Sequence, residues 1–281
     1  MRILVTNDDG YDALGLRVLV EILRPFGEIT VVAPKYHQSG MSMAVTLGYK
    51  PIAVKQLSCK AGERWYYLDG TPASCVKFAY GRLFDEGQAP DLVVSGINHG
   101  GNYATAALYS GTLGAAMEGG LLCIPSIAVS IDKLQPEEKD FDVVRKFFPK
   151  IIRHMSQLPP YRFGMVYNIN FPAVKPSEMK GIRVTRPGVM RWVRELVPFE
   201  EQTYRQLYPE PSHRGMPNNP VLEAGETLYA MSGEIVLDPA NDENCDIAQI
   251  AKGYTTVCAI NLDNCDLVQQ QKLIDSGIEN L

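Results

Sequence analysis

Two patterns of apolar positions alternate along the first 130 residues. Short apolar runs, typical of buried strands, are separated by stretches in which apolar residues recur at helical spacing, as Leu16, Leu19 and Leu23 do before Pro25 and Gly27. We expect strands at residues 1–6, 28–33, 64–68, 92–95 and 124–130, and helices at 16–23, 71–80 and 112–119. This alternation predicts an α/β fold with a Rossmann-like, mostly parallel sheet and helices on both faces.

The alternation of strand-like and helix-like stretches becomes less regular after residue 130. A helix through Phe141, Val144 and Phe148, strands at 165–170 and 254–260 and a terminal helix at 268–281 are still expected. Residues 187–241 lose periodicity but keep large side chains, namely Trp192, Val193, Leu196, Val197, Phe199, Tyr204, Leu207 and Tyr208. The predicted division is one domain over residues 1–281, with a core at 1–185, an extended oligomerisation excursion at 187–241 and a C-terminal helix, strand and helix at 242–281. A partner surface would bury those apolar residues.

Composition narrows the classes of function. The 281 residues are 46% hydrophobic and 21% charged, which suits an ample globular core. The net charge of -5 and the absence of long basic runs argue against a nucleic-acid polymer as partner. No segment has the length of a membrane span, and six cysteines without a CxxC pair read as reduced thiols. We therefore expect a cytoplasmic protein that does not bind membranes.

Two adjacent aspartates, Asp8 and Asp9, follow the first expected strand. In an open parallel sheet the carboxyl ends of the strands border the ligand crevice, so both side chains are expected there. Two close carboxylates repel each other unless a cation or a shared proton intervenes. If one aspartate only capped the next helix, the other would remain unexplained. Oxygen ligands suit a hard ion such as magnesium, manganese or calcium.

Three further loops are expected at the same edge of the sheet. Ser39 supplies a hydroxyl, and Asn98 and Asn102 supply amide oxygens that suit the same cation. Ser110, Gly111 and Thr112 precede a helix, whose first N–H groups bind anions such as phosphate. Each short motif alone is more often an ordinary turn, but their joint placement at strand ends favours a site.

Several motifs in order resemble the stationary-phase survival protein family SurE, which comprises metal-dependent nucleotidases and phosphatases. These motifs are TNDDG, VVAP followed by SGMS, DGTPASCV, PDLVVSGIN, YSGTLGAAMEG, IPSIAVS and YNINFP. The resemblance covers about the first 185 residues in order and spacing, and Asn244 to Ile247 with Lys252 to Val257 resembles the family's C-terminal acidic segment and strand.

The resemblance implies specific roles. One divalent ion per subunit, magnesium or manganese with calcium as a third candidate, would be held by Asp8, Asp9, Ser39 and Asn98. The substrate phosphate would be contacted by Asn98, Asn102, Ser110, Gly111 and Thr112. The family's exchange of C-terminal segments implies a homodimer or homotetramer.

Two departures from the family pattern stand out. Residues 35–38 read Lys-Tyr-His-Gln where many members have an Asp-Arg-Asn-Arg-like run, which leaves the base preference open. Cys245 stands where a threonine is frequent.

We predict a phosphomonoesterase that hydrolyses 5′-nucleotides, and 3′-nucleotides as a second class, with acid phosphatase activity. The ion would disperse charge and activate water, and Asp8 or Asp9 would serve as base or nucleophile. His99 is more often a bystander than a participant in such a loop. A non-catalytic metal and nucleotide sensor on the same fold is the alternative. The chain lacks GxGxxG after its first strand and GxxxxGK[ST] anywhere, which argues against dinucleotide-dependent and P-loop enzymes.

Overall fold

A nine-stranded sheet forms the centre of the protein. The computed structural model describes residues 1–48, 50–84, 87–158, 162–202, 222–263 and 265–276. The strand order is β3-β4-β2-β1-β5-β6-β7-β13-β8. In that order the strands span Val54–Lys60, Glu63–Leu68, Glu28–Pro34, Arg2–Thr6, Leu92–His99, Ser126–Ile131, Met165–Phe171, Thr255–Asn261 and Ile182–Val184.

The predicted fold class is confirmed. Strands β4, β2, β1, β5, β6 and β7 run parallel, while β3 pairs antiparallel with β4 and β13 pairs antiparallel with β7. Strand β3 was not predicted, because six of its seven residues are exposed and it lacks an apolar face. It covers the edge of β4 and so leaves the parallel strands in the interior of the sheet.

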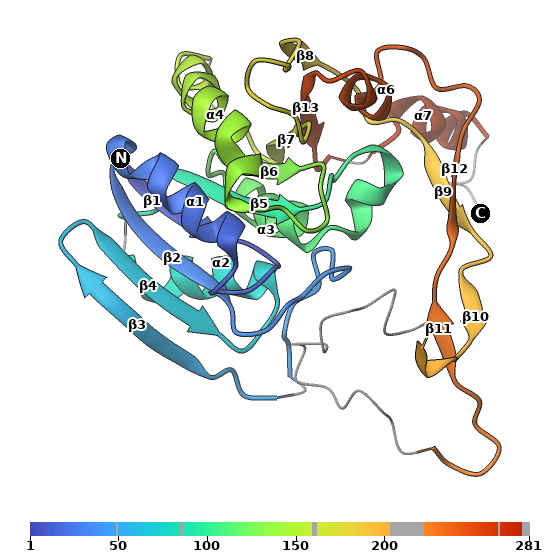
Figure 1. Ribbon diagram of the computed structural model, residues 1–281, viewed down its shortest axis with the longest axis horizontal. Coiled ribbons are helices and arrows are strands. Elements are labelled where there is room, and N and C mark those ends of the chain that lie inside the picture. The colour runs from blue at the N-terminus through green and yellow to red at the C-terminus, as the bar shows by residue number, and fades with distance from the viewer. Residues whose placement is uncertain (49, 85–86, 159–161, 203–221, 264, 277–281) are drawn as a thin grey trace.

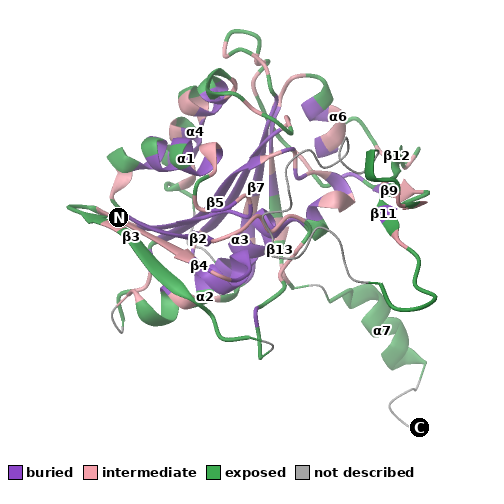
Figure 2. Ribbon diagram, turned by 60° about the horizontal axis from the view of Figure 1, so that its bottom comes forward, coloured by how far each residue is buried: buried purple, intermediate pink, exposed green. Residues whose placement is uncertain are grey.

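Helices cover both faces of this sheet (Figure 2). Helices α1, Leu14–Leu23, and α4, Asp142–Met155, pack over the face that contains Ile3 and Val5. Helices α2, Pro72–Arg82, and α3, Gly111–Leu121, lie on the face that contains Leu4. Successive residues of β1 therefore enter opposite cores, as the period of a strand requires. Short 3-10 helices span Arg24–Phe26, Ala104–Tyr109 and Glu138–Phe141, named η1, η2 and η3.

One expected loop is instead strand. The sequence predicted that the strand from residue 92 ends at Ser95, but β5 continues to His99 with a register shift against β6 between Gly96 and Asn98. Gly96 has a φ of 135°, and a Cβ there would lie 2.2 Å from the carbonyl oxygen of Val129. Glycine is therefore required at this irregularity.

Among its described residues, the region after β8 forms two small antiparallel sheets. Strand β9, Met190–Val193, pairs with β12, Glu234–Leu237, and β10, Leu196–Pro198, pairs with β11, Tyr229–Met231. We call these four strands the arm, and they extend to one side of the main sheet (Figure 1). The predicted apolar residues Tyr204, Leu207 and Tyr208 lie outside the described residues.

The C-terminal part returns to the sheet. Helix α6, Asp246–Ala251, precedes β13, and helix α7, Leu267–Asp275, follows it. The terminal helix was predicted over residues 268–281, of which 277–281 lie outside the described part. None of the helices in the described residues combines the length and the apolar character that crossing a bilayer requires.

Candidate functional site

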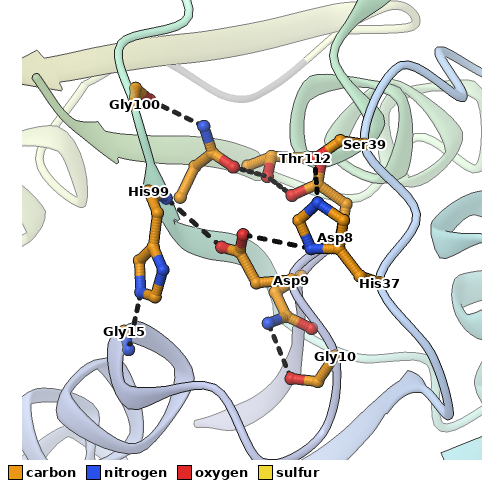
Figure 3. Close-up of polar contacts among 11 residues, drawn as sticks. Asp8, Asp9, Gly10, Gly15, His37, Ser39, His99, Gly100 and Thr112 are labelled. Carbon is orange, nitrogen blue, oxygen red and sulfur yellow. Dashed lines mark hydrogen bonds and ion pairs between the residues drawn. The ribbon is translucent and has the colours of Figure 1, made fainter. Parts of the chain in front are cut away.

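The two predicted aspartates lie together at the carboxyl end of β1 (Figure 3). Asp8 is 3% exposed and the side chain of Asp9 is 7% exposed. The hydroxyl of Thr112, at the start of α3, donates a short hydrogen bond to Asp8 Oδ1 and lies 3.3 Å from Asn98 Oδ1. Residues from β5, from α3 and from the loop after β1 thus meet, and Asp8, Asp9, Asn98 and Thr112 had all been predicted as site residues.

Burial controls the electrostatics of this pair. It raises the pKa of Asp8, while hydrogen bonds from the side chain and backbone of Thr112 partly oppose that rise. It raises the pKa of Asp9 well above the ordinary value, and the negative charge of Asp8 raises it further. The backbone N–H of His99 donates to Asp9 Oδ2 over 3.2 Å and favours the charged form. The pair is therefore costly to ionise without an added cation.

His37 connects the third expected ligand to the aspartates. Its Nδ1 lies 3.7 Å from Asp9 Oδ1 and its Nε2 lies 2.6 Å from Ser39 Oγ. The backbone N–H of Gln38 also donates to the carbonyl oxygen of Asp8 over 2.7 Å. The sequence did not predict His37 as a site residue. The sequence contained one indication, which is that His37 lies within residues 35–38, where the chain differs from the family pattern.

The amino end of α3 faces the carboxylates. Ser110 is the N-cap residue, and its Oγ accepts a hydrogen bond of 3.0 Å from the backbone N–H of Leu113. A Cβ on Gly111 would lie 2.8 Å from the Cβ of Asp8, so only glycine permits this approach. The first N–H groups of a helix bind anions, which suits a phosphate beside the carboxylates.

Asn102 takes part in a separate buried network. Its side-chain amide donates to Ser130 Oγ over 3.0 Å, and its carbonyl oxygen accepts from the side chains of Asn168 and Asn170 over 2.7 and 3.0 Å. The N–H of Asn102 also donates to Asn170 Oδ1 over 2.7 Å. These bonds fix the loop between β5 and η2. Contact between Asn102 and phosphate stays a prediction.

His99 is directed away from the carboxylates (Figure 3). Burial, together with the neighbouring charge of His37, lowers the pKa of His99 to about 4. The neutral ring accepts a hydrogen bond at Nε2 from the backbone N–H of Gly15 over 3.3 Å. Its side chain therefore supports helix α1, while its backbone supports Asp9.

Asp246 is a supporting residue that sequence reasoning did not identify. It is fully buried at the start of α6, and its carboxylate accepts from the backbone N–H groups of Ala104 and Gly188 over 3.0 and 2.8 Å. Ala104 begins η2, which leads directly to Ser110. The only sequence signal was the family-like acidic segment, and that segment does not reveal its contacts.

The donor set fits a hard divalent ion. In the described part of the chain no Lys or Arg forms an ion pair with Asp8 or Asp9, and no three His, Cys, Asp or Glu side chains are arranged so that they alone could hold a metal ion. The two buried carboxylates therefore lack a compensating cationic side chain of that kind. The oxygens of Asn98 and Ser39 complement them in chemistry, and an added cation would remove the repulsion that raises the pKa of Asp9.

Comparison with known proteins gives a family match over more than half of the chain. A sequence model described as Survival protein SurE matches residues 3–194. The chain belongs to the SurE family.

Curated SurE proteins match over most of their length. The proteins named 5′-nucleotidase SurE from Christiangramia forsetii and from Syntrophomonas wolfei are each 35% identical to this chain. The two matches cover 93% and 100% of this chain, and 91% and 97% of the relatives. The protein of the same name from Myxococcus xanthus is 42% identical over 74% of this chain and 75% of its own length.

A solved SurE structure has the same fold. The crystal structure of the SurE protein from Aquifex aeolicus matches with a TM-score of 0.72 and 29% sequence identity, covering 98% of both chains. The match therefore includes the arm region as well as the sheet that carries the site.

Proposed function

We propose that this protein hydrolyses nucleoside monophosphates to nucleoside and phosphate with the help of one divalent metal ion per subunit. The substrates would be 5′-nucleotides, 3′-nucleotides as a second class and, more slowly, other phosphomonoesters. The observation that carries the proposal is the buried pair Asp8 and Asp9, which lies between oxygen donors and the amino end of α3. The 5′-nucleotidase name of the relatives supports it.

Asp8, Asp9, Ser39 and Asn98 would hold magnesium or manganese. When bound, the ion would neutralise charge on the phosphoryl group and lower the pKa of water. The carboxylate orientations are already fixed, Asp8 by the hydroxyl of Thr112 and Asp9 by the N–H of His99. Asn98 is oriented by a 2.6 Å hydrogen bond from its Nδ2 to the carbonyl oxygen of Gly100.

The remaining work is positioning and charge stabilisation, which dominate phosphoryl transfer. The N–H groups of Gly111 and Thr112 would receive the phosphate oxygens at the amino end of α3. Ser110 holds that helix end in place through its cap. Asp8 or Asp9 would accept the proton of the attacking water, or attack phosphorus directly, and the two roles are alternatives.

The decisive experiment removes and restores the ion. Purified protein is assayed with adenosine 5′-monophosphate after treatment with excess chelator, and then with magnesium or manganese added back. We expect hydrolysis to be abolished and then restored. Full activity in excess chelator would refute the metal assignment, and nucleotide binding without turnover under every metal condition would favour the sensor.

A further inference from the structure

Three tyrosines and a lysine gather at the carboxyl ends of β2 and β4. The rings of Tyr11 and Tyr67 lie with their centroids 5.3 Å apart. The Nζ of Lys35 lies 4.9 Å from the ring centre of Tyr36 and 5.7 Å from that of Tyr67. The lysine thus links Tyr36 and Tyr67 in one patch, which we call the tyrosine patch.

The tyrosine patch lies at the same sheet edge as the site. Tyr36 immediately precedes His37, whose ring contacts Asp9, and Tyr11 follows Asp9 by two residues. Backbone hydrogen bonds fix this arrangement, because the N–H of Tyr11 donates to Pro34 over 3.0 Å at the end of β2. The patch is therefore joined through short stretches of backbone to Asp9 and His37.

Strand geometry sets the separation between patch and carboxylates. Tyr67 stands near the carboxyl end of β4, and β2 lies between β4 and β1. Two strand spacings amount to about 10 Å across the sheet. In a nucleotide, the sugar separates the phosphate from the base by a distance comparable to this one.

The four side chains of the tyrosine patch are half-buried rather than enclosed in the core. Tyr11 also borders a groove of about 630 Å³ that follows α1 and the same face of β4 as far as Trp65. Aromatic rings with accessible faces and a cation beside them are the usual surface for stacking a base.

We propose that Tyr36, Tyr67 and Lys35 bind the nucleobase of the substrate, with Tyr11 supporting Tyr67 from behind. The base stacks on the tyrosine rings while the phosphate occupies the amino end of α3. This inference rests on the proposed nucleotidase function and deepens it. It also gives residues 35 and 36, within the segment where the chain departs from its family, a part in substrate selection.

The experiment compares a substrate that has a base with one that lacks it. The ratio of kcat/KM for adenosine 5′-monophosphate to kcat/KM for ribose 5-phosphate is measured in manganese for the wild type and for Tyr36→Leu, Tyr67→Leu and Lys35→Gln. Tyr36→Phe keeps the ring and serves as the conservative variant. Tyr80→Leu, an exposed tyrosine of α2, is the matched control.

We expect Tyr36→Leu and Tyr67→Leu to lower the ratio about tenfold, because loss of one stacking partner has an effect of this order. The loss should appear in KM for adenosine 5′-monophosphate, with ribose 5-phosphate hydrolysis nearly unchanged. Lys35→Gln should lower the ratio less, and Tyr36→Phe and Tyr80→Leu should leave it unchanged. Calorimetric titration with adenosine gives a second readout that does not depend on turnover.

The other outcomes overturn the proposal in distinguishable ways. An unchanged ratio in both leucine variants would exclude the patch as a base site while leaving the nucleotidase function intact. Equal loss on both substrates would mean that the tyrosines only maintain the fold. A wild type that hydrolyses neither substrate would refute the proposed function, and the base site with it.

Discussion

The carboxyl edge of the sheet buries polar side chains, whereas the arm exposes apolar ones. At the edge, polar side chains such as Asp8, Asn98 and Thr112 are buried and bonded to one another within a single chain. In the arm, apolar side chains such as Leu196 and Tyr229 are 63% and 58% exposed. The edge holds its polar groups with the chain's own contacts, whereas the arm leaves apolar surface uncovered.

This difference indicates where a second molecule is needed. Buried polar groups are stable when each has a partner, and the edge supplies hydrogen-bond partners for Asp8, Asp9 and Asn98 but, among the described residues, no Lys or Arg to balance the two carboxylates. A two-stranded ribbon is only marginally stable in water without further packing. We therefore propose that the arm packs against another copy of the chain in a homodimer or homotetramer, where one surface serves both subunits.

The largest expected effect is at the edge. Asp9→Asn keeps the shape of the side chain but removes a negative ligand. We expect metal affinity and the rate of hydrolysis to fall by at least about tenfold. Asp91→Asn is the control, since Asp91 lies at the opposite end of β5 and pairs with Arg2. A metal titration unchanged by Asp9→Asn would count against Asp9 as a ligand.

The second prediction tests the arm. Light scattering at micromolar concentration should give at least the mass of a dimer. The double variant Leu196→Glu and Met231→Glu places two charges on paired residues of β10 and β11, and should lower the mass to that of a monomer. Leu134→Glu, on a loop residue that is 80% exposed, should have no effect. A monomeric wild type would refute obligate assembly.

The third prediction compares the reactivity of exposed thiols with that of buried ones. Cys59, Cys123 and Cys265 are exposed, and the other three cysteines are buried. Burial raises the pKa of Cys75, and raises that of Cys258 to about 12, so both remain protonated. At pH 8, Ellman's reagent should label three thiols rapidly in the native protein and six after denaturation.

The same shifts make stability depend on pH. The unfolded chain releases thiol protons from roughly pH 8.5 upward, while the folded protein retains them. The stabilising effect is fully present below that pH and is lost progressively as the pH rises from there toward the folded pKa of Cys258, which is about 12. Rapid labelling of a fourth thiol in native protein would contradict the buried assignment.

The smallest effect concerns the cap of α6. Cys245 occupies the N-cap position but makes no side-chain capping hydrogen bond. A threonine hydroxyl would accept one from the helix, so Cys245→Thr should raise the free energy of unfolding by about 0.5–1 kcal/mol. Urea denaturation measures this, with Cys245→Ala as the control. If threonine stabilised no more than alanine, the position would not depend on capping.

Local sequence determined the regular elements of the sheet region. Thr71 was expected to cap a helix with Pro72 in its first turn, and its hydroxyl accepts from the N–H of Ser74. Strand and helix periods are set by neighbouring residues, which is why β1 and α1 were predictable from their apolar positions. Two aspartates at the end of a buried strand were also sufficient to indicate a site at that edge.

Only the tertiary structure decided which groups meet. The register shift after Gly96 extends β5 to His99, and no local pattern signals it, because it depends on pairing with β6. His37 contacts Asp9 and Ser39 because the loop that follows β2 brings it to them. Asp246 supports Ala104 across 142 positions of sequence. Apolar periodicity records which face of an element is buried, whereas contacts of this kind depend on strand order and on the approach of distant backbone segments.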